Sequence, residues 1–232
     1  MKIGIMQPYF LPYIGFFQLI AQVDQFIIYD NIKYTKKGWI NRNRMLLNST
    51  DTCFSLPLKK ASDSLDVVQR EISPDFNRRK LLNQFKGAYQ RAPYFEQTFA
   101  LLDPIIHNVE QNLFRYIHHS ITAVCRYLDI GTTIHTSSSI SINHELKSEH
   151  RVIALCEAMN ARTYINPIGG TELYDRSKFS MHGIDLRFIK TIPFEYQQFG
   201  ATFVPFLSIV DVLMFNSPSA VRDHIQRNFE IV

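Results

Sequence analysis

The side chains best suited to bind an anion cluster between residues 30 and 44. Basic, amide and aromatic residues alternate there: Lys33, Tyr34, Lys36, Lys37, Trp39, Asn41, Arg42, Asn43 and Arg44. Arginine pairs with phosphate or carboxylate through two parallel hydrogen bonds, and a tryptophan ring can stack on a base or cover a sugar face. A solvated basic loop would have the same composition. We favour a binding role, because Trp39 is the only tryptophan and its ring is costly to leave exposed.

Arg42 and Arg44 are two residues apart. On an extended segment this spacing places both side chains on one side of the backbone. We therefore predict that both hold the phosphate of an anionic ligand, with Lys36 as a third cation, and that neither arginine is structural. Replacing either arginine by alanine should weaken binding by ~1.5–3 kcal/mol, the range for a hydrogen bond to a charged group, and leave folding nearly intact.

A second group of candidates lies in the loop that follows the first predicted strand. This loop reads QPYFLPY over residues 7–13, and its two prolines stiffen it. Gln7 and Tyr13 are the polar side chains that we expect to orient a ligand. The alternative is a rigid loop that only packs the core. We favour a site, because a loop leading from a strand into a helix offers free backbone N–H groups to an anion.

A third group follows a later predicted strand. Asn166 is expected to orient polar groups of a ligand. The glycine pair Gly169 and Gly170 permits positive φ and a close approach of the backbone to a ligand. An ordinary turn after a strand explains this pair nearly as well.

Ser208 and Asp211 lie in a helix predicted over residues 206–215, after Pro205. The positive N-terminal end of this helix could close a ligand pocket. Asp211 is one candidate general base, and Asp30, which ends the second predicted strand, is the other. Core packing is the alternative for this segment, and it suits Phe206 better than Asp211.

Other chemistries find little support in the sequence. His144 and His150 are six residues apart, which does not place them on one helical face, so we expect no metal site. Cys53 and Cys156 are expected to be small core residues rather than nucleophiles. The sequence contains no Walker A, G-x-G-x-x-G or G-x-S-x-G motif, and it identifies no cofactor.

Predicted strands and helices alternate along most of the chain. We predict strands at residues 2–6, 24–29, 53–58, 132–134, 163–165 and 184–189, and helices at 13–21, 76–89, 113–128, 148–160, 206–215 and 217–227, with a helix start at 73–75. The opening strand, helix and strand form a βαβ unit, which indicates a parallel sheet. The pattern predicts a single α/β domain over residues 1–232, with a Rossmann-like parallel sheet and a helical insert or second helical layer at about 74–130.

The loops that follow parallel strands emerge at one edge of the sheet. The loops that begin at Gln7, at Asp30 and at Asn166 should therefore converge on one pocket. A placement of the Gln7 and Gly169 loops on opposite edges would exclude this shared site.

Charge and hydropathy limit the class of protein. The net charge of +4 suits a small anionic substrate, such as a nucleotide sugar or an acyl donor, and is too small to indicate nucleic acid. No secretory signal opens the sequence, and no apolar run reaches the ~18 residues of a membrane span, so we expect a cytoplasmic protein. Three sparse cysteines argue against a disulfide framework. The oligomeric state stays open, and a homo-oligomer is one option.

The segment FLPYIGF at residues 10–16 resembles the start of the nucleotidylyltransferase superfamily, where a Phe-Asp-Pro loop precedes a Gly-His pair. Leu11 stands in the place of the aspartate and Phe16 in that of the histidine. The resemblance is therefore to a fold element. The missing histidine counts against nucleotidyl transfer, because that side chain stabilises the charge on the transferred phosphate.

Three blocks together resemble the WbqC-like family. They read IGIMQPYFLPYIGFFQLI, DQFIIYDNIKYTKKGWINRNRM, and YINPIGGTELYDRSKFSMHGIDLRF followed by FVPFLSIVDVLMFN. Many genes of that family lie among those for O-antigen and other surface polysaccharides, so the resemblance implies a role in making or decorating activated sugars. The leading hypothesis is a transferase that attaches an acyl or aminoacyl group to a nucleotide-linked amino sugar or a related anionic intermediate. A nucleotidyltransferase-like enzyme and a non-catalytic ligand-binding or scaffold protein are the alternatives.

Overall fold

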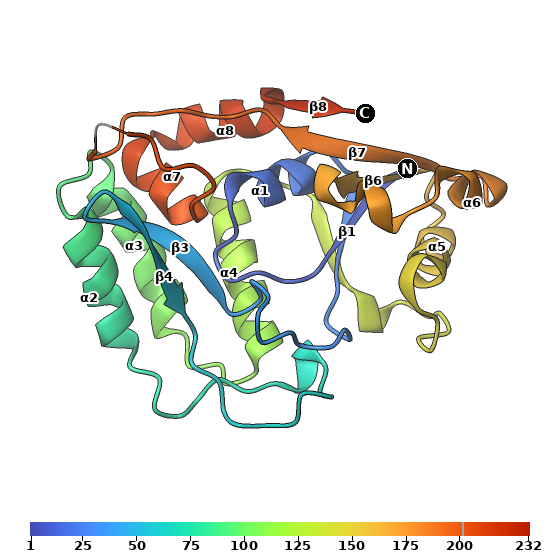
Figure 1. Ribbon diagram of the computed structural model, residues 1–232, viewed down its shortest axis with the longest axis horizontal. Helices are drawn as coiled ribbons and strands as arrows, with labels where there is room; N and C mark the ends of the chain where they lie inside the picture. Colours follow the sequence, from blue (N-terminus) through green and yellow to red (C-terminus); the bar gives the residue numbers. More distant parts are fainter. Residues whose placement is uncertain (201) are drawn as a thin grey trace.

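A mostly parallel sheet forms the centre of the molecule. The computed structural model describes residues 1–200 and 202–232, and among these six strands lie in the order β5-β2-β1-β6-β7-β8 (Figure 1). They are β1 (Lys2–Met6), β2 (Gln25–Ile28), β5 (Thr133–Thr136), β6 (Thr163–Pro167), β7 (Asp185–Thr191) and β8 (Phe229–Ile231). All are parallel except β8, which is antiparallel to β7. The predicted α/β fold with a parallel sheet is confirmed.

The order of the strands is that of a Rossmann-like sheet. From β1 the chain builds outward to β2 and β5, then returns to the other side of β1 to add β6 and β7. Ligands of open α/β sheets bind at the carboxyl ends of the strands where this order reverses. In this chain the reversal lies between β1 and β6.

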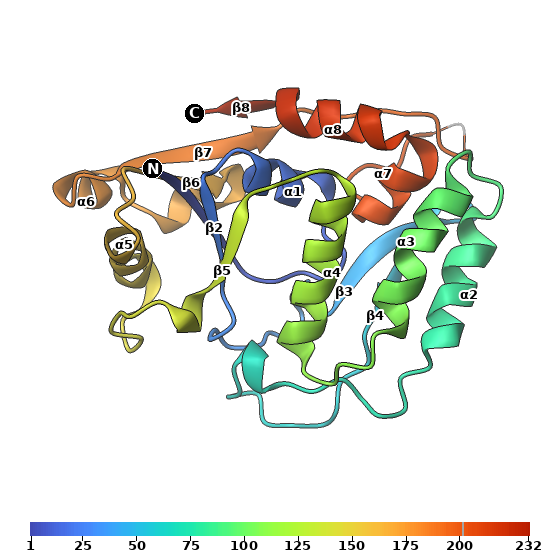
Figure 2. The same ribbon diagram turned by 180° about the vertical axis from the view of Figure 1, so that it is seen from behind.

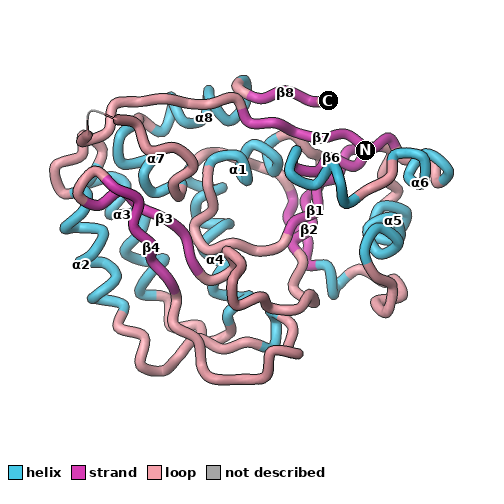
Figure 3. Tube along the Cα trace, viewed as in Figure 1, coloured by secondary structure: helices cyan, strands magenta, loops and turns pink. Residues whose placement is uncertain are grey.

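Helices cover both faces of the sheet, because alternate side chains of its strands are apolar on both faces. The helices are α1 (Ile14–Ala21), α2 (Arg78–Tyr89), α3 (Phe95–His107), α4 (Leu113–Tyr127), α5 (Ser148–Ala158), α6 (Arg176–Met181), α7 (Ile209–Phe215) and α8 (Pro218–Arg227). Figure 3 shows α5 and α6 on one side of β1 and β2, and α1 and α4 on the other. Ile3 and Ile5 of β1 pack with residues of α5 and α6, whereas Phe26 and Ile28 of β2 pack with residues of α1 and α4. None of the helices in the described part of the chain is long and apolar enough to cross a membrane.

A helical lobe stands beside the sheet. It consists of α2, α3 and α4, which pack with the antiparallel hairpin of β3 (Arg42–Leu47) and β4 (Thr50–Ser55) (Figures 1 and 2). All three helices fall within the stretch where a helical insert or second layer was predicted. The sequence pattern did not predict α3, whose interior contains Pro104.

The hairpin differs from the predicted strand at residues 53–58. β4 runs over residues 50–55 instead, and β3 was not predicted as a strand. Asn48 and Ser49 form the two-residue turn between them, with φ of 51° and 60°. Polar residues in the first half of β3 hide the apolar alternation on which strand prediction depends.

Two predicted helix starts are wrong. α2 begins after Asn77, whose side chain accepts a hydrogen bond from the Lys80 N–H at 2.8 Å, and not at residues 73–75. α7 begins at Ile209, because Ser208 caps it by accepting from the Val210 N–H at 3.3 Å. Phe206, predicted as helical, has a φ of 57° and cannot belong to the helix.

Candidate functional site

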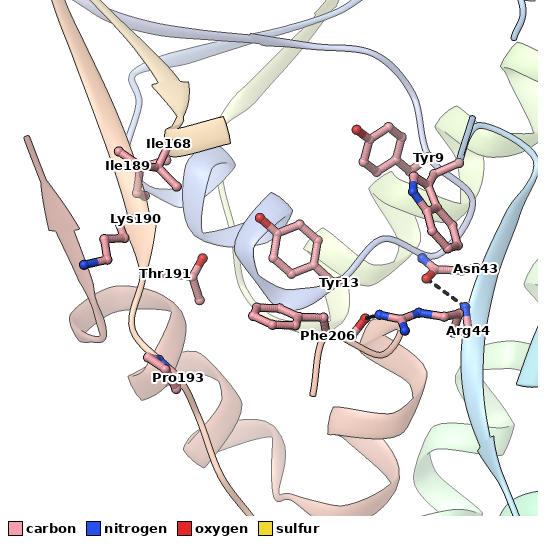
Figure 4. Close-up of a pocket in the computed structure, with 11 residues that line it drawn as sticks. Tyr9, Tyr13, Asn43, Arg44, Ile168, Ile189, Lys190, Thr191, Pro193 and Phe206 are labelled. Atoms are coloured by element: carbon pink, nitrogen blue, oxygen red, sulfur yellow. Dashed lines mark hydrogen bonds between the residues drawn. The ribbon is translucent and has the colours of Figure 1, made fainter. Parts of the chain in front are cut away.

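A pocket of about 580 Å³ opens at the carboxyl edge of the sheet (Figure 4). Its lining combines aromatic rings with two cations: Tyr9, Tyr13, Trp39, Asn43, Arg44, Ile168, Ile189, Lys190, Thr191, Pro193 and Phe206. These residues come from the segments that follow β1, β2 and β6, from β7, and from the segment before α7. The predicted convergence of the loops at one edge is confirmed, because the register of β1 with β6 places both carboxyl ends together.

Hydrogen bonds to the backbone of the loop after β1 hold it against β3, the residues just before β3 and the start of α7. The Phe10 N–H donates to the Ile40 carbonyl at 2.9 Å. The Leu11 carbonyl accepts from Asn43 Nδ2 at 2.8 Å and from Ser208 Oγ at 2.7 Å. Asn43 also lines the pocket, whereas Ser208 is fully buried. The structure thus assigns positioning roles to two residues that the sequence suggested as direct ligand contacts.

Two non-glycine residues at the site have left-handed backbones. Leu11 has φ of 47° and Phe206 has φ of 57°. Such conformations cost a non-glycine residue of order 1–3 kcal/mol each and tend to cluster at functional sites. Leu11 is fully buried, but Phe206 is 64% exposed and its ring forms part of the pocket wall. The fold therefore holds an apolar ring at the surface beside a cavity.

Tyr13 and Thr191 lie side by side on the pocket wall (Figure 4). Burial raises the pKa of Tyr13, and the neighbouring Thr191 hydroxyl partly opposes this, so the phenol keeps its proton and can donate a hydrogen bond to a ligand. Gly15 makes the arrangement possible. A Cβ at that position would lie 2.4 Å from the Tyr13 ring and 2.5 Å from Thr191 Oγ1.

Gln7 supports the second tyrosine of the pocket. Its Nε2 donates to the Tyr9 hydroxyl at 2.8 Å, and burial raises the pKa of Tyr9. The Tyr9 ring packs against Phe16 with centroids 5.6 Å apart. Gln7 lies beside the pocket rather than on its wall, and it orients the ring that does form the wall.

Trp39 contacts both arginines of β3. The guanidinium carbons of Arg42 and Arg44 lie 5.5 and 5.8 Å from the Trp39 ring centroid, so the two side chains do share one side of the strand. Arg42, however, donates to the carbonyls of Gly38 and Lys37 at 2.8 and 2.6 Å and does not line the pocket. The prediction that Arg42 is not structural is wrong, because its guanidinium fastens the turn that carries Trp39.

Arg44 lies on the pocket wall with its charge partly accessible. Its Nη1 is 2.8 Å from a carboxylate oxygen of Asp51, and its Nη2 donates to the Phe206 carbonyl at 3.1 Å. Through these contacts Arg44 joins the hairpin to the segment before α7. The Arg44 guanidinium remains accessible to a ligand, because the side chains of Arg44 and Asp51 are both partly exposed.

Two further residues of the basic segment point elsewhere. Lys36 pairs with Asp63 at 2.9 Å on the exposed surface. Asn41 accepts from the Tyr34 hydroxyl at 2.8 Å and donates to the Leu56 carbonyl at 2.7 Å. Neither residue lines the pocket. The oxygen and the nitrogen of the Asn41 side-chain amide are both used in hydrogen bonds within the fold.

The residues after β6 support the pocket through Ile168. Asn166 is buried, and its Oδ1 accepts from the Tyr164 hydroxyl at 3.1 Å. Gly169 and Gly170 lie in a short 3-10 helix and do not use the positive φ that a glycine pair permits. Gly170 is needed for close approach to Asn166, because a Cβ there would lie 1.9 Å from its Nδ2.

Neither candidate general base reaches this pocket. Asp211 is fully buried, and its carboxylate accepts from the hydroxyls of Tyr89 and Tyr196 at 2.9 and 2.6 Å and from Gln198 Nε2 at 2.7 Å. Burial raises the pKa of Asp211, and these three donors oppose the rise. Asp30 is also buried and fastens the end of β2 to the turn after β5.

The expectations for cysteines and metals meet different outcomes. Cys156 is buried, and burial raises its pKa to about 12, so it is the inert core residue that was predicted. Cys53 lies on β4 and is exposed, contrary to the prediction. Over the described residues, no three side chains of histidine, cysteine, aspartate or glutamate gather as a metal site would require.

Seven residues of the pocket wall were not among the predicted site residues: Tyr9, Ile168, Ile189, Lys190, Thr191, Pro193 and Phe206. Tyr9 was hidden within an apolar loop, and Lys190, Thr191 and Pro193 lie at and beyond the end of β7. The strand predicted at residues 184–189 ended just before them. The rule that ligands meet the carboxyl ends of parallel strands would have identified the segment that follows that strand.

The Rossmann-like sheet defines an α/β protein, with an aromatic pocket where its strand order reverses, the position at which open sheets of this class bind ligands. The sequence profile of the WbqC-like protein family matches residues 7–223, and the chain belongs to this family. An uncharacterised protein of Mycobacterium tuberculosis, Rv1507c, is 27% identical over 228 residues, which cover 97% of each chain. No solved structure matches.

Proposed function

We propose that this chain is a transferase that binds a nucleotide-linked sugar, or a related anionic intermediate, in the aromatic pocket. The group transferred is an acyl or aminoacyl group, and an amino sugar accepts it. The observation that carries the proposal is the pocket wall, in which four aromatic rings stand with Arg44 and Lys190. The surface-polysaccharide setting implied by the family resemblance supports the same substrate class.

The wall suits a ligand with flat faces and negative charge. Aromatic rings stack on bases or cover the apolar face of a sugar, and Arg44 offers charge-assisted hydrogen bonds to phosphate. Lys190, whose ammonium lies 3.5 Å from Glu230, adds positive charge at the edge of the pocket. A volume of about 580 Å³ falls within the ~300–1,000 Å³ that small-molecule sites occupy. The hydroxyls of Tyr13 and Thr191 add polar groups that can select the orientation of a sugar.

The chemistry at this site must rest mainly on orientation. Among the described residues that line the pocket there is no carboxylate, imidazole or thiol. Holding a donor and an acceptor in the reactive geometry can by itself supply roughly 7–11 kcal/mol of a transfer barrier. The protonated Tyr13 hydroxyl can stabilise charge on a carbonyl oxygen by donating a hydrogen bond to it.

The lack of an acid–base pair also favours a second candidate, a ligand-binding protein without catalysis. Nucleotidyl transfer has weaker support. Phe16, in the place of the superfamily histidine, is buried and packs against Phe26 with centroids 5.5 Å apart. No side chain at that position can reach a phosphate.

Trp39 supplies a direct test. It is the only tryptophan and lies on the pocket wall, so a ligand in the pocket should change the intrinsic fluorescence. We expect nucleotide-linked amino sugars to give a saturable change, which Trp39→Phe abolishes while calorimetry still detects weakened binding. Mass spectrometry after addition of acyl-coenzyme A or aminoacyl donors should reveal an acylated sugar.

The outcomes separate the candidates. Saturable binding with no product from any donor supports the ligand-binding protein. If the folded chain binds no nucleotide-linked sugar by fluorescence or calorimetry, both the transferase and the ligand-binding protein are excluded.

A further inference from the structure

A second pocket lies at the same edge of the sheet, beyond the carboxyl ends of β2 and β5. It has a volume of about 440 Å³ and shares no lining residue with the aromatic pocket. The first turns of α4 form one wall, and the end of β5 with the segments that follow β2 and β5 forms the other. Its position at strand ends is one where open α/β sheets bind ligands.

The α4 wall carries hydrogen-bond donors on a single helical face. Arg115, His118, His119 and Thr122 follow the spacing i, i+3, i+4 and i+7, which places them in one stripe that lines the pocket. Within the part of the chain that the structure describes, the side chains of Arg115, His118 and His119 make no hydrogen bond. Arg115 approaches Glu110 only at 4.0 Å. Thr122 Oγ1 already donates to the carbonyls of His118 and His119 at 3.0 Å each, so the guanidinium and the two imidazoles are the groups available to a ligand.

The opposite wall contributes hydroxyls and a hydrogen-bonded acid. Thr136 and Ser138 line it together with Asp30. The Asp30 carboxylate accepts from Ser137 Oγ at 2.8 Å, from the Ser138 N–H at 2.9 Å and from Ser138 Oγ at 2.6 Å. These three donors hold the carboxylate against its own wall, and the groups that face the cavity from α4 are cationic or neutral donors.

The two histidines are neighbours on α4, and neither forms an ion pair within the described residues. Burial and the neighbouring His119 lower the pKa of His118. An anion in the cavity would relieve this by supplying the missing negative charge.

We infer that this second pocket binds a phosphate-bearing ligand, whose oxygens accept hydrogen bonds from Arg115, His118 and His119. A guanidinium beside two imidazoles on one helical face matches an anion with several oxygens, and Phe114 and Val68 give the cavity an apolar floor. The inference does not depend on the function proposed for the aromatic pocket.

Inorganic pyrophosphate is the probe, titrated calorimetrically at constant ionic strength with chloride as the reference anion. We expect saturable binding that Arg115→Gln weakens about tenfold or more, and His119→Gln to a similar degree, as the loss of a charged hydrogen bond requires. Arg79→Gln is the matched control, because both arginines are exposed in the first turn of a helix capped by asparagine. It should bind as the wild type does.

Three results would overturn the inference. They are an absence of saturable pyrophosphate binding by the folded wild type, a loss of affinity in Arg79→Gln as large as that in Arg115→Gln, and an unchanged affinity in Arg115→Gln. A loss confined to Arg44→Gln would place the anion in the aromatic pocket instead. Thermal unfolding without pyrophosphate should be the same for the wild type, Arg115→Gln, His119→Gln and Arg79→Gln, which excludes a folding defect as the cause.

Discussion

Arg42 and Arg44 share a strand face but differ in how much of each guanidinium the fold already uses. Arg42 gives two donors to the turn that carries Trp39. Arg44 has one backbone carbonyl and one partly exposed carboxylate as partners, and it lines the pocket. Direct contact with a ligand therefore falls to Arg44, and Arg42 positions the tryptophan.

Arg44→Gln should weaken binding of the nucleotide-linked sugar by ~1.5–3 kcal/mol, because a charged hydrogen bond to phosphate is lost. Asp51→Asn is the control, since it breaks the same ion pair and keeps the guanidinium. Calorimetric titration of both variants checks this. If Asp51→Asn lost as much affinity as Arg44→Gln, the ion pair rather than the free charge would be what matters.

At the scale of elements, α1 places Tyr13 only because its second residue is glycine. The room that Gly15 leaves is filled by the Tyr13 ring and by Thr191 of β7. Helix α1 can therefore approach strand β7 closely at Gly15, and the Tyr13 ring packs into the space where a larger residue would place its side chain.

Gly15→Ala should destabilise the fold by ~1–3 kcal/mol, because the new methyl group overpacks this space, and should reduce ligand binding by displacing Tyr13. Gly87→Ala in α2 is the matched control. Nothing lies within 4 Å of a Cβ there, so it should stabilise the chain by ~0.5–1 kcal/mol. Urea unfolding measures both, and equal effects at the two sites would contradict the packing argument.

The contact between α1 and α8 depends on uncharged polar groups. Gln18 is fully buried and donates to the carbonyls of His224 and Asn228 at 3.3 and 2.9 Å. His224 stacks on Phe194 with centroids 3.9 Å apart, and its Nδ1 lies 2.7 Å from Asn228 Nδ2. Burial lowers the pKa of His224 to about 4 from its usual 6.5.

This shift makes stability depend on pH. Between pH 6.5 and 4 the His224 imidazole is protonated in the unfolded chain but not in the folded one. The free energy of unfolding should therefore fall as the pH is lowered through this range. One group contributes a slope of at most about 1.4 kcal/mol per pH unit. Urea unfolding at several pH values should show a shallower slope for His224→Gln than for the wild type. Equal slopes would show that the imidazole titrates normally.

At the scale of the whole molecule, Asp211 joins segments that lie far apart in the sequence. Its carboxylate meets Tyr89 from α2, whose hydroxyl also accepts from the Leu46 N–H of β3 at 2.8 Å. Tyr196 and Gln198 reach it from the segment that follows β7. One buried acid thus ties the helical lobe to the end of the sheet.

Asp211→Ala should destabilise the fold by at least ~3 kcal/mol, because three buried donors lose their acceptor at ~1–3 kcal/mol each. Asp223→Ala, at an exposed position of α8, should have little effect. Chemical denaturation of both variants tests this. An Asp211→Asn variant with full stability and no transfer activity would instead support a catalytic base.

The sequence by itself determined the parallel sheet, because apolar strands that alternate with amphipathic helices can bury both faces in few other ways. It also determined that the motifs around Tyr13, Trp39 and Ile168 converge, since loops after parallel strands share an edge. These conclusions need only local periodicity and the direction of the chain.

Only the tertiary structure decided what each side chain does. Spacing placed Arg42 and Arg44 together, but the neighbouring carbonyls decided which of them faces a ligand. Asp211 looked like a base from its place near a helix start, and burial among donors from distant segments made it structural. The physical reason is that accessibility and hydrogen-bond partners are set by contacts between residues far apart in the sequence, which local patterns do not contain.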